Sequence, residues 1–336
     1  YEANGFLAEA MAHASTSGDS KRQVWLLAEN VLTMAYLGEL TTLVQWLDAM
    51  PAEAGQDQPW FHVSQAWVLV FAGHLDDVEP HLLAAERLFM VASTVDGGAE
   101  PDPATDHIAG HIAAIRGYVS GLRGDPKASI DCARRAIEIL PEQDAMARGW
   151  TTLLLAVILR AQGKLVDADH AFSEAATISK KAGIVPLAVD VLWEHCVQAL
   201  MQGRLNWVYS TCQEAQQLEA VYVERGGRRL PPAGYTHIGI SLVLHEWNDA
   251  EGALEHAKEA ASQCKFWGMA DAIVRSHVRL AMAYHTIGDI SGTQNALEEA
   301  RQVADAMSPM YEGIVAMFVA RIHIDQGKLA EAERWV

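Results

Sequence analysis

A recurring order of small, polar and apolar residues runs along most of the chain. Each occurrence has a Gly or Asn, then an acidic or polar residue, and then an Ala-rich stretch. The apolar residues recur at three- and four-residue spacing, as in residues 153–161, which places them on one face of a helix. No segment alternates in the way that a strand requires. The pattern therefore predicts a series of helical hairpins.

Eight residues that tolerate a left-handed backbone mark the turns of these hairpins. They follow one another at intervals of 35 to 51 residues, with most intervals near 40. A Gly or Asn at this place ends one helix, and the acidic or polar residue after it favours the start of the next. These turn anchors are Gly38, Gly73, Gly124, Gly163, Gly203, Asn248, Gly288 and Gly327.

Two columns of small residues keep a fixed distance from the turn anchors, and close crossing of two helices requires such residues. Seven residues before the anchors from Gly73 onward stand Ala66, Gly117, Ala156, Cys196, Ser241, Ala281 and Ala320. Twelve residues after the anchors from Gly73 to Gly288 stand Ala85, Ala136, Ala175, Ala215, Ala260 and Ala300. The first hairpin departs from both columns, with Val31 in one and Met50-Pro51 at the other.

These columns correspond to the small positions of the tetratricopeptide repeat. We predict an all-α, right-handed superhelical solenoid of about eight tetratricopeptide-like hairpins, with a period of about 40 residues. Residues 1–336 form one solenoid domain in this prediction, with irregular helices at 1–58 and regular hairpins at 59–336. Longer loops at 93–103 and 224–233 account for the two longest intervals.

Composition narrows the classes of function. The 43 acidic and 25 basic residues give a formal charge of −18, which disfavours direct contact with nucleic acid, since phosphate binding depends on Lys and Arg. No apolar run reaches the length of a membrane span. Four widely spaced cysteines without paired spacing indicate reduced, mostly buried thiols and a cytoplasmic protein.

Two stretches resemble one family. The segment with His13-Ala14 and Ser17-Gly18-Asp19, followed by LGELTTLVQWLDAMPAE, is similar to the "HA…aGD…" and "rGEL…L.rWLdaLPee" patterns of the MalT-like transcription activators. The stretch LHEWNDAEGAL at 244–254 resembles the signature "lyEWNdLe.A" of the same family. These are large ATP-binding regulators with a LuxR-type DNA-binding end, and the resemblance falls on their helical-repeat sensor region.

The resemblance implies a ligand-sensing, regulatory interaction domain within a larger regulator. It implies ATP in a nucleotide-binding domain outside this segment, a helix-turn-helix domain, and an inducer that is an oligosaccharide in the archetype. The segment itself has no G-x-x-x-x-G-K-[ST] phosphate-binding loop, so we expect no cofactor in it. We interpret the chain as a fragment of the larger protein.

The tetratricopeptide register predicts which side chains of the first helices face the inner groove. Many of them are aromatic or hydrogen-bonding, which suits a sugar or another small polar ligand, and would equally suit a peptide. We assign Trp25, Trp46, Trp207 and Trp267 to packing. The candidate ligand-binding residues are His111, Tyr118, Trp150, Arg160, Asp190, Trp193, Tyr235 and His245.

Catalytic and metal-binding patterns are weak. His107 and His111 have the spacing of two metal ligands on one helix, but no HExxH or fixed third ligand accompanies them, so a groove-facing or capping pair is the more ordinary interpretation. No G-x-S-x-G elbow is present. We therefore expect neither an enzyme nor a metal site. The alternative to a sensor is a scaffold that binds a peptide or regulatory protein, and the acidic charge favours a basic partner.

Overall fold

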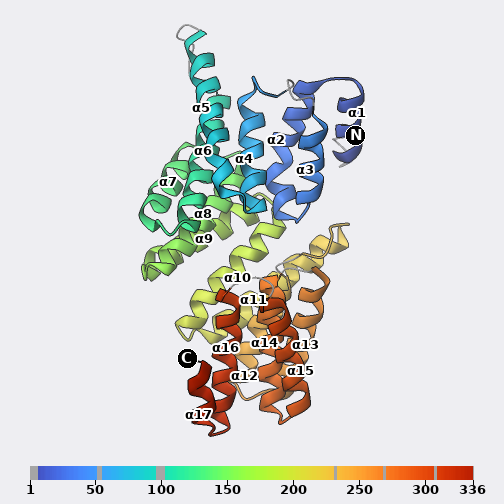
Figure 1. Ribbon diagram of the computed structural model, residues 1–336, viewed down its shortest axis with the longest axis vertical. Coiled ribbons are helices and arrows are strands. Elements are labelled where there is room, and N and C mark those ends of the chain that lie inside the picture. The colour runs from blue at the N-terminus through green and yellow to red at the C-terminus, as the bar shows by residue number, and fades with distance from the viewer. Residues whose placement is uncertain are drawn as a thin grey trace. The chain divides into compact units, whose positions relative to one another are not determined.

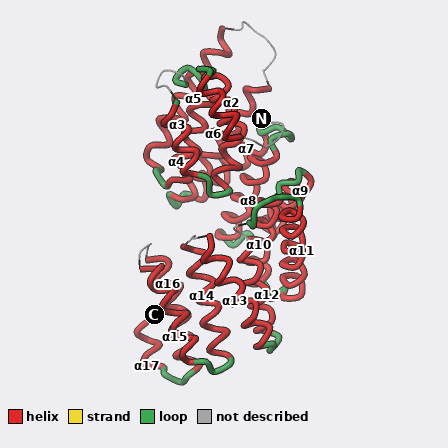
Figure 2. Tube along the Cα trace, turned by 90° about the vertical axis from the view of Figure 1, so that its right-hand side faces the viewer, coloured by secondary structure: helices red, strands yellow, loops and turns green. Residues whose placement is uncertain are grey.

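The computed structural model describes residues 7–50, 55–95, 103–230, 233–267, 270–305 and 309–335. The described residues form helices joined by turns and contain no strand (Figures 1 and 2). Among them, no helix is both long enough and apolar enough to cross a membrane. The all-α fold predicted from the sequence is confirmed.

After α1 (Leu7–Thr16), the helices alternate as the first and second members of hairpins. The first four hairpins are α2 (Ser20–Tyr36) with α3 (Leu40–Ala49), α4 (Pro59–Ala72) with α5 (Val78–Val95), α6 (Pro103–Leu122) with α7 (Pro126–Ile139), and α8 (Ala145–Ala161) with α9 (Leu165–Lys181). A 3-10 turn, η2 (Leu75–Asp77), precedes α5.

The remaining helices continue this alternation. They are α10 (Val185–Met201) and α11 (Leu205–Glu224), α12 (Ala233–Glu246) and α13 (Ala250–Trp267), α14 (Ala270–Thr286) and α15 (Ile290–Asp305), and α16 (Pro309–Asp325) with the short α17 (Leu329–Ala332) and η3 (Glu333–Trp335).

Every turn anchor adopts the left-handed backbone that the pattern requires. The angle φ is 71° at Gly163 and 61° at Asn248, which is the one residue other than glycine with positive φ in the described part of the chain. Around Gly163 the N–H of Lys164 bonds to the carbonyl of Leu159 at 2.9 Å, which closes the end of α8. All eight anchors have φ between 61° and 81°.

The acidic residues that follow several anchors cap the next helix. Asp125 accepts a hydrogen bond from the backbone N–H of Ala128 at 3.0 Å. Asp249 and Asp289 accept from Gly252 and Gly292 at 3.0 and 2.8 Å. These bonds satisfy backbone donors that have no partner within the helix, and they confirm the predicted helix starts.

Both small-residue columns lie where the two helices of a hairpin touch. Ala66 and Ala156 of the first column and Ala85 and Ala136 of the second are 0% exposed. A Cβ at Gly117 would lie 3.3 Å from the backbone nitrogen of Ala133, so a larger side chain would push α6 away from α7. Small side chains are therefore a packing requirement at these positions.

The chain divides into two compact units, Tyr1–Leu187 and Ala188–Val336, here called unit 1 and unit 2. Within unit 1, α4 packs on α2 and α6, α6 packs on α8, and α2 also touches α8. In unit 2, one core cluster joins buried residues of α10 to α14, and another joins α14, α15 and α16. The single-domain organisation of residues 1–336 stays a prediction.

Candidate ligand-binding pocket

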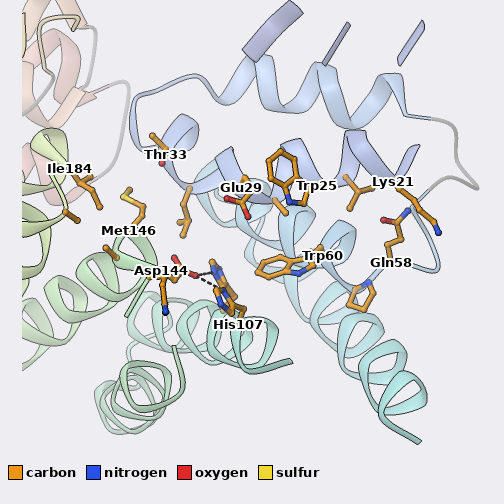
Figure 3. Close-up of a pocket in the computed structure, with 18 of the residues that line it drawn as sticks. Lys21, Trp25, Glu29, Thr33, Gln58, Trp60, His107, Asp144, Met146 and Ile184 are labelled. Atoms are coloured by element: carbon orange, nitrogen blue, oxygen red, sulfur yellow. Dashed lines mark hydrogen bonds and ion pairs between the residues drawn. The ribbon is translucent and has the colours of Figure 1, made fainter. Parts of the chain in front are cut away.

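The first helices of unit 1 surround a pocket of about 950 Å³ (Figure 3). Contributions come from α2, the start of α4, the first turns of α6, the start of α8 and the turn before α10. Because α2 reaches α8, these helices enclose the space from several sides. Its principal lining residues are Lys21, Trp25, Glu29, Thr33, Gln58, Trp60, His107, His111, Gln143, Asp144, Met146 and Ile184.

Two tryptophans from neighbouring helices project toward this pocket (Figure 3). Trp25 of α2 is 45% exposed, and the guanidinium of Arg22 lies 4.2 Å from its ring centroid. Trp60 of α4 is half-buried and meets the ring of His111 edge-on at 5.1 Å. The prediction that Trp25 is a packing residue is wrong, because its indole is an exposed part of the pocket wall.

A directed chain of hydrogen bonds connects the core to the pocket. The indole N–H of Trp67 donates to Nδ1 of His111 at 2.9 Å. An indole nitrogen can only donate, so Nδ1 of His111 must accept, and its proton lies on Nε2. Nε2 then donates to Oδ2 of Asp144 at 2.7 Å. The bonds hold His111 as one neutral tautomer, with its ring fixed between α4 and α8.

Asp144 has a second role as the cap of α8. Its Oδ1 accepts from the backbone N–H of Ala147 at 3.2 Å, while His107 approaches its Oδ2 at 3.7 Å. Burial alone would raise the pKa of this carboxyl, but its interactions with His111, Ala147 and His107 together outweigh burial and lower the pKa. Asp144 is therefore a stable anion at the pocket wall.

Helix α2 adds charge of both signs beside Trp25. Lys21, Trp25 and Glu29 follow one another at four-residue spacing and line the pocket along one face of the helix. Lys21 and Glu29 are exposed, so their charged ends can reach a ligand without first losing buried contacts. The wall thus combines aromatic faces with donors and acceptors, which suits reversible binding.

Histidines, cysteines and carboxylates are the possible metal ligands of the described residues, and no three of them are grouped so as to hold a metal ion. His107 and His111 both turn toward Asp144, which agrees with the interpretation of a groove-facing pair. The cysteines in the described part form no disulfide, and Cys196, Cys212 and Cys264 are buried, as the sequence indicated.

Of the eight predicted binding residues, four lie in unit 1, and His111 is the one that lines this pocket. Trp150 is 7% exposed and packs edge-on against Trp67 at 5.2 Å. Tyr118 lies against Trp150 at 4.9 Å. The guanidinium of Arg160 lies 5.4 Å from the ring centroid of Phe172.

The other four predicted residues lie in unit 2. Trp193 stacks on Tyr235 with centroids 5.2 Å apart and an interplanar angle of 11°, and both belong to a buried cluster. His245 lies 3.3 Å from the hydroxyl of Thr286, and burial lowers its pKa. Asp190 is half-buried on α10. A ligand-binding role for these residues, and for Tyr118, Trp150 and Arg160, stays a prediction.

The remaining packing assignments have different outcomes. Trp207 packs against a core cluster and lies 4.6 Å from the ring of His195, as predicted. Trp46 is half-buried on α3. The side chain of Trp267 lies outside the described residues. Asp144 was not among the predicted residues, although an Asp directly before a helical segment is the usual signal of a helix N-cap and marks this position.

Comparison with known proteins places the fold in a family. A family model described as the MalT-like TPR region matches residues 110–336. The HTH-type transcriptional regulator MalT of Cronobacter sakazakii (strain ATCC BAA-894) is 25% identical over 213 residues, which are 63% of this chain and 22% of that protein. The chain therefore spans about a fifth of the length of that relative.

Solved structures with low sequence identity share the architecture. A signal transduction ATPase with numerous domains and a tetratricopeptide repeat sensor, from Pyrococcus horikoshii, gives a TM-score of 0.67 at 13% identity, over 98% of this chain and 48% of that chain. The complex of NprR with its cognate peptide NprX gives a TM-score of 0.62 at 8% identity, over 94% of this chain and 87% of that one. At these identities the likeness concerns the fold alone.

Proposed function

Because the chain belongs to the MalT-like TPR family, we propose that it is the inducer-sensing region of an ATP-dependent transcription activator. Family membership supports a regulatory sensor or interaction domain. In this proposal the nucleotide-binding and DNA-binding domains are other parts of the full-length cytoplasmic protein, and ATP binds there. The charge of −18 supports a role in which this segment itself does not touch DNA.

The inducer in this proposal binds in the pocket of unit 1. The observation that carries it is the combination of two accessible indoles, Trp25 and Trp60, with a fixed polar network on the facing wall. A volume of about 950 Å³ is near the upper end of the range typical of small-molecule sites. We propose a small polar ligand with an apolar face, such as an oligosaccharide, whose face stacks on the indoles.

A polar ligand here has specific partners. His107, Gln143 and Glu29 line the pocket and can bond to hydroxyl groups, while Asp144 is already engaged by His111. A ligand hydroxyl that takes up the remaining acceptor capacity of Asp144 would act on the residue that caps α8 and holds α6. Ligand binding would thereby affect the hairpins of α8 and α6, and also that of α4, whose Trp67 bonds to His111.

The proposal is tested by a thermal-shift screen of the purified chain against malto-oligosaccharides, other sugars and small polar metabolites. A ligand that binds the folded state raises the unfolding midpoint by mass action, corresponding to about 2.7 kcal/mol at one hundred times Kd. We expect at least one small polar compound to raise the midpoint in a concentration-dependent way. No shift with any member of a broad library would contradict the proposal.

A peptide is the second candidate ligand, favoured by the resemblance of the fold to NprR in complex with its peptide NprX. The same pocket could hold a few residues of an extended chain, and the acidic protein would favour a basic peptide. A screen of short peptides of both charges beside the metabolite screen separates the two candidates. A shift with peptides only would replace the sugar-like ligand by a peptide or a regulatory protein.

A further inference from the structure

Two hairpins, one in each unit, carry a pair of histidines at the same register of the repeat. In α4 and α5 the pair is His62 and His81, which lie 11 residues before and 8 after the anchor Gly73. In α12 and α13 it is His237 and His256, 11 before and 8 after Asn248.

The hairpin fold does not itself require histidine at these positions. At the same register the hairpin of α6 and α7 has Ala113 and Cys132. The hairpin of α14 and α15 has His277 opposite Ala296, so one histidine occurs there without the other. The two pairs are therefore a feature of the sequence beyond the repeat pattern.

In both pairs the Nδ1 atoms point at each other. The Nδ1–Nδ1 distance is 3.3 Å for His62 and His81 and 3.0 Å for His237 and His256. One shared proton on Nδ1 accounts for each contact without a metal ion. Two imidazole nitrogens bound to one tetrahedral zinc ion, each about 2.05 Å from it, would lie about 3.3 Å apart. A metal ion bound by both Nδ1 atoms would keep about this separation of the two nitrogens, while each ring turns so that its lone pair points at the ion.

The second ring nitrogen of His62, Nε2, has a hydrogen-bond partner that leaves Nδ1 able to bind a metal ion. Its Nε2 lies 3.3 Å from the backbone carbonyl of Gln56, and a carbonyl can only accept, so Nε2 carries the proton. The lone pair is then on Nδ1, facing His81. Metal-bound histidines usually donate their second ring N–H to such an outer partner, which sets the tautomer and the ring orientation.

Carboxylates lie close enough to both pairs to favour a bound cation. The charge of Asp77 acts on the ring of His81. In the other pair the charge of Glu255 acts on His256, and that of Glu259 acts on both rings, while the cation of Arg229 opposes it at His237.

We propose that each histidine pair is a chelating site for a divalent first-row transition-metal ion such as Zn²⁺. The described residues contain no group of three potential ligand side chains, so water completes the coordination in this proposal. Imidazole nitrogen selects Zn²⁺, Ni²⁺ and Cu²⁺ over Mg²⁺ and Ca²⁺. The bound ion would join the first and second helices of its hairpin, α4 to α5 and α12 to α13.

The test is the number of Zn²⁺ ions bound by the purified chain, measured by competition with a chromophoric chelator. The double variants are His62→Gln with His81→Gln, and His237→Gln with His256→Gln. Gln keeps polar side chains at these positions, so folding can be retained. His74→Gln changes an exposed histidine of the α4–α5 hairpin and is the matched control. Circular dichroism establishes that each variant is folded.

We expect each double variant to bind one Zn²⁺ fewer than the wild type, the combination of both to bind two fewer, and His74→Gln to bind the same number. A single substitution in a pair should weaken binding by more than the roughly 10- to 100-fold that loss of an outer partner causes. Zinc binding of unchanged stoichiometry and affinity in a folded double variant would overturn the assignment of that pair.

Discussion

The two units use aromatic residues of their first helices in different ways. In unit 1, Trp25 and Trp60 stand on a pocket wall and remain accessible. In unit 2, Trp193 and Tyr235 stack on each other at 5.2 Å and are buried in a core cluster. The repeat register supplies an aromatic residue in both places. Whether such a ring is accessible to a ligand depends on the side chains that the neighbouring helices pack against it.

This difference follows from the side chains that pack against each ring. Trp193 and Tyr235 stack on one another, so the fold itself removes their apolar surface from water. The ring of Trp25 has the guanidinium of Arg22 4.2 Å from its centroid and is left 45% exposed. An accessible tryptophan beside fixed polar groups is a better guide to a binding site than an inward register alone.

The largest effect on stability is expected in unit 2. Trp193→Ala removes a buried indole from its stack and should lower the free energy of unfolding by about 3–5 kcal/mol. Urea denaturation followed by circular dichroism measures this change. Trp193→Phe is the control, since it keeps an aromatic ring against Tyr235 and should cost far less. A cost below that of an exposed substitution would mean that Trp193 is not a core residue.

A smaller effect is expected at the polar wall of unit 1. Asp144→Ala removes the cap of α8 and leaves the N–H of His111 without its acceptor, and should cost about 2–3 kcal/mol. Asp144→Asn keeps an oxygen for the cap and should cost less. Equal and negligible costs for both variants would show that the network does not hold the wall.

Asp144 also makes the stability of the fold depend on pH, and its contribution decreases on acidification. Its pKa is lower in the folded than in the unfolded state, so its ionised form stabilises the fold above the unfolded-state pKa of about 3.9. This contribution is lost as the pH falls from there through the folded-state pKa. Asp144→Asn should therefore lose less stability than the wild type on acidification, in urea titrations at stepwise lower pH.

The turn anchors offer a comparison between the units with an intermediate effect. Gly163→Ala in unit 1 places a Cβ at φ 71° and should cost about 1–2 kcal/mol. Asn248→Gly in unit 2 relieves strain at φ 61° and should change stability by less than about 1 kcal/mol. Thermal unfolding of both variants tests this, and a stabilised Gly163→Ala would contradict the left-handed turn.

The smallest effects on stability are expected for two exposed tryptophans that form a matched pair. Trp25 in unit 1 is 45% exposed and Trp247 in unit 2 is 43% exposed. Each substitution by Ala should change the free energy of unfolding by about 0.5 kcal/mol or less. Their effects on binding should differ, since Trp25 lines the pocket and Trp247 rests against Tyr209. Equal effects on binding would remove the distinction between the units.

The hairpins could be predicted from the sequence because local chemistry fixes them. Turn glycines require a left-handed backbone and the two Ala-rich columns require close helix contact, and both requirements are visible in one sequence. The pocket was harder to predict, since it forms where α2 reaches α8, a long-range contact without a local signal. Trp25 lies in the irregular first hairpin, where Val31 replaces the small residue of the first column, and it was assigned to packing there.

His111 was predicted because it lies in the regular part of the chain, at an inward position of α6. Asp144 belongs to the turn before α8, outside the inward register, and its role depends on His111 reaching it from another hairpin. Residues on loops and helix caps are therefore the ones that the repeat pattern misses, although they complete the polar wall.

The central claim is that the pocket of unit 1 is the sensing site, and ligand affinity in matched variants tests it most directly. Isothermal titration of a ligand found by the screen should be made on the wild type, on Trp25→Ala with Trp60→Ala, and on Trp247→Ala. We predict at least about a tenfold loss of affinity, ~1.4 kcal/mol, for the double variant, and wild-type affinity for Trp247→Ala. Wild-type affinity in the folded double variant would contradict the account.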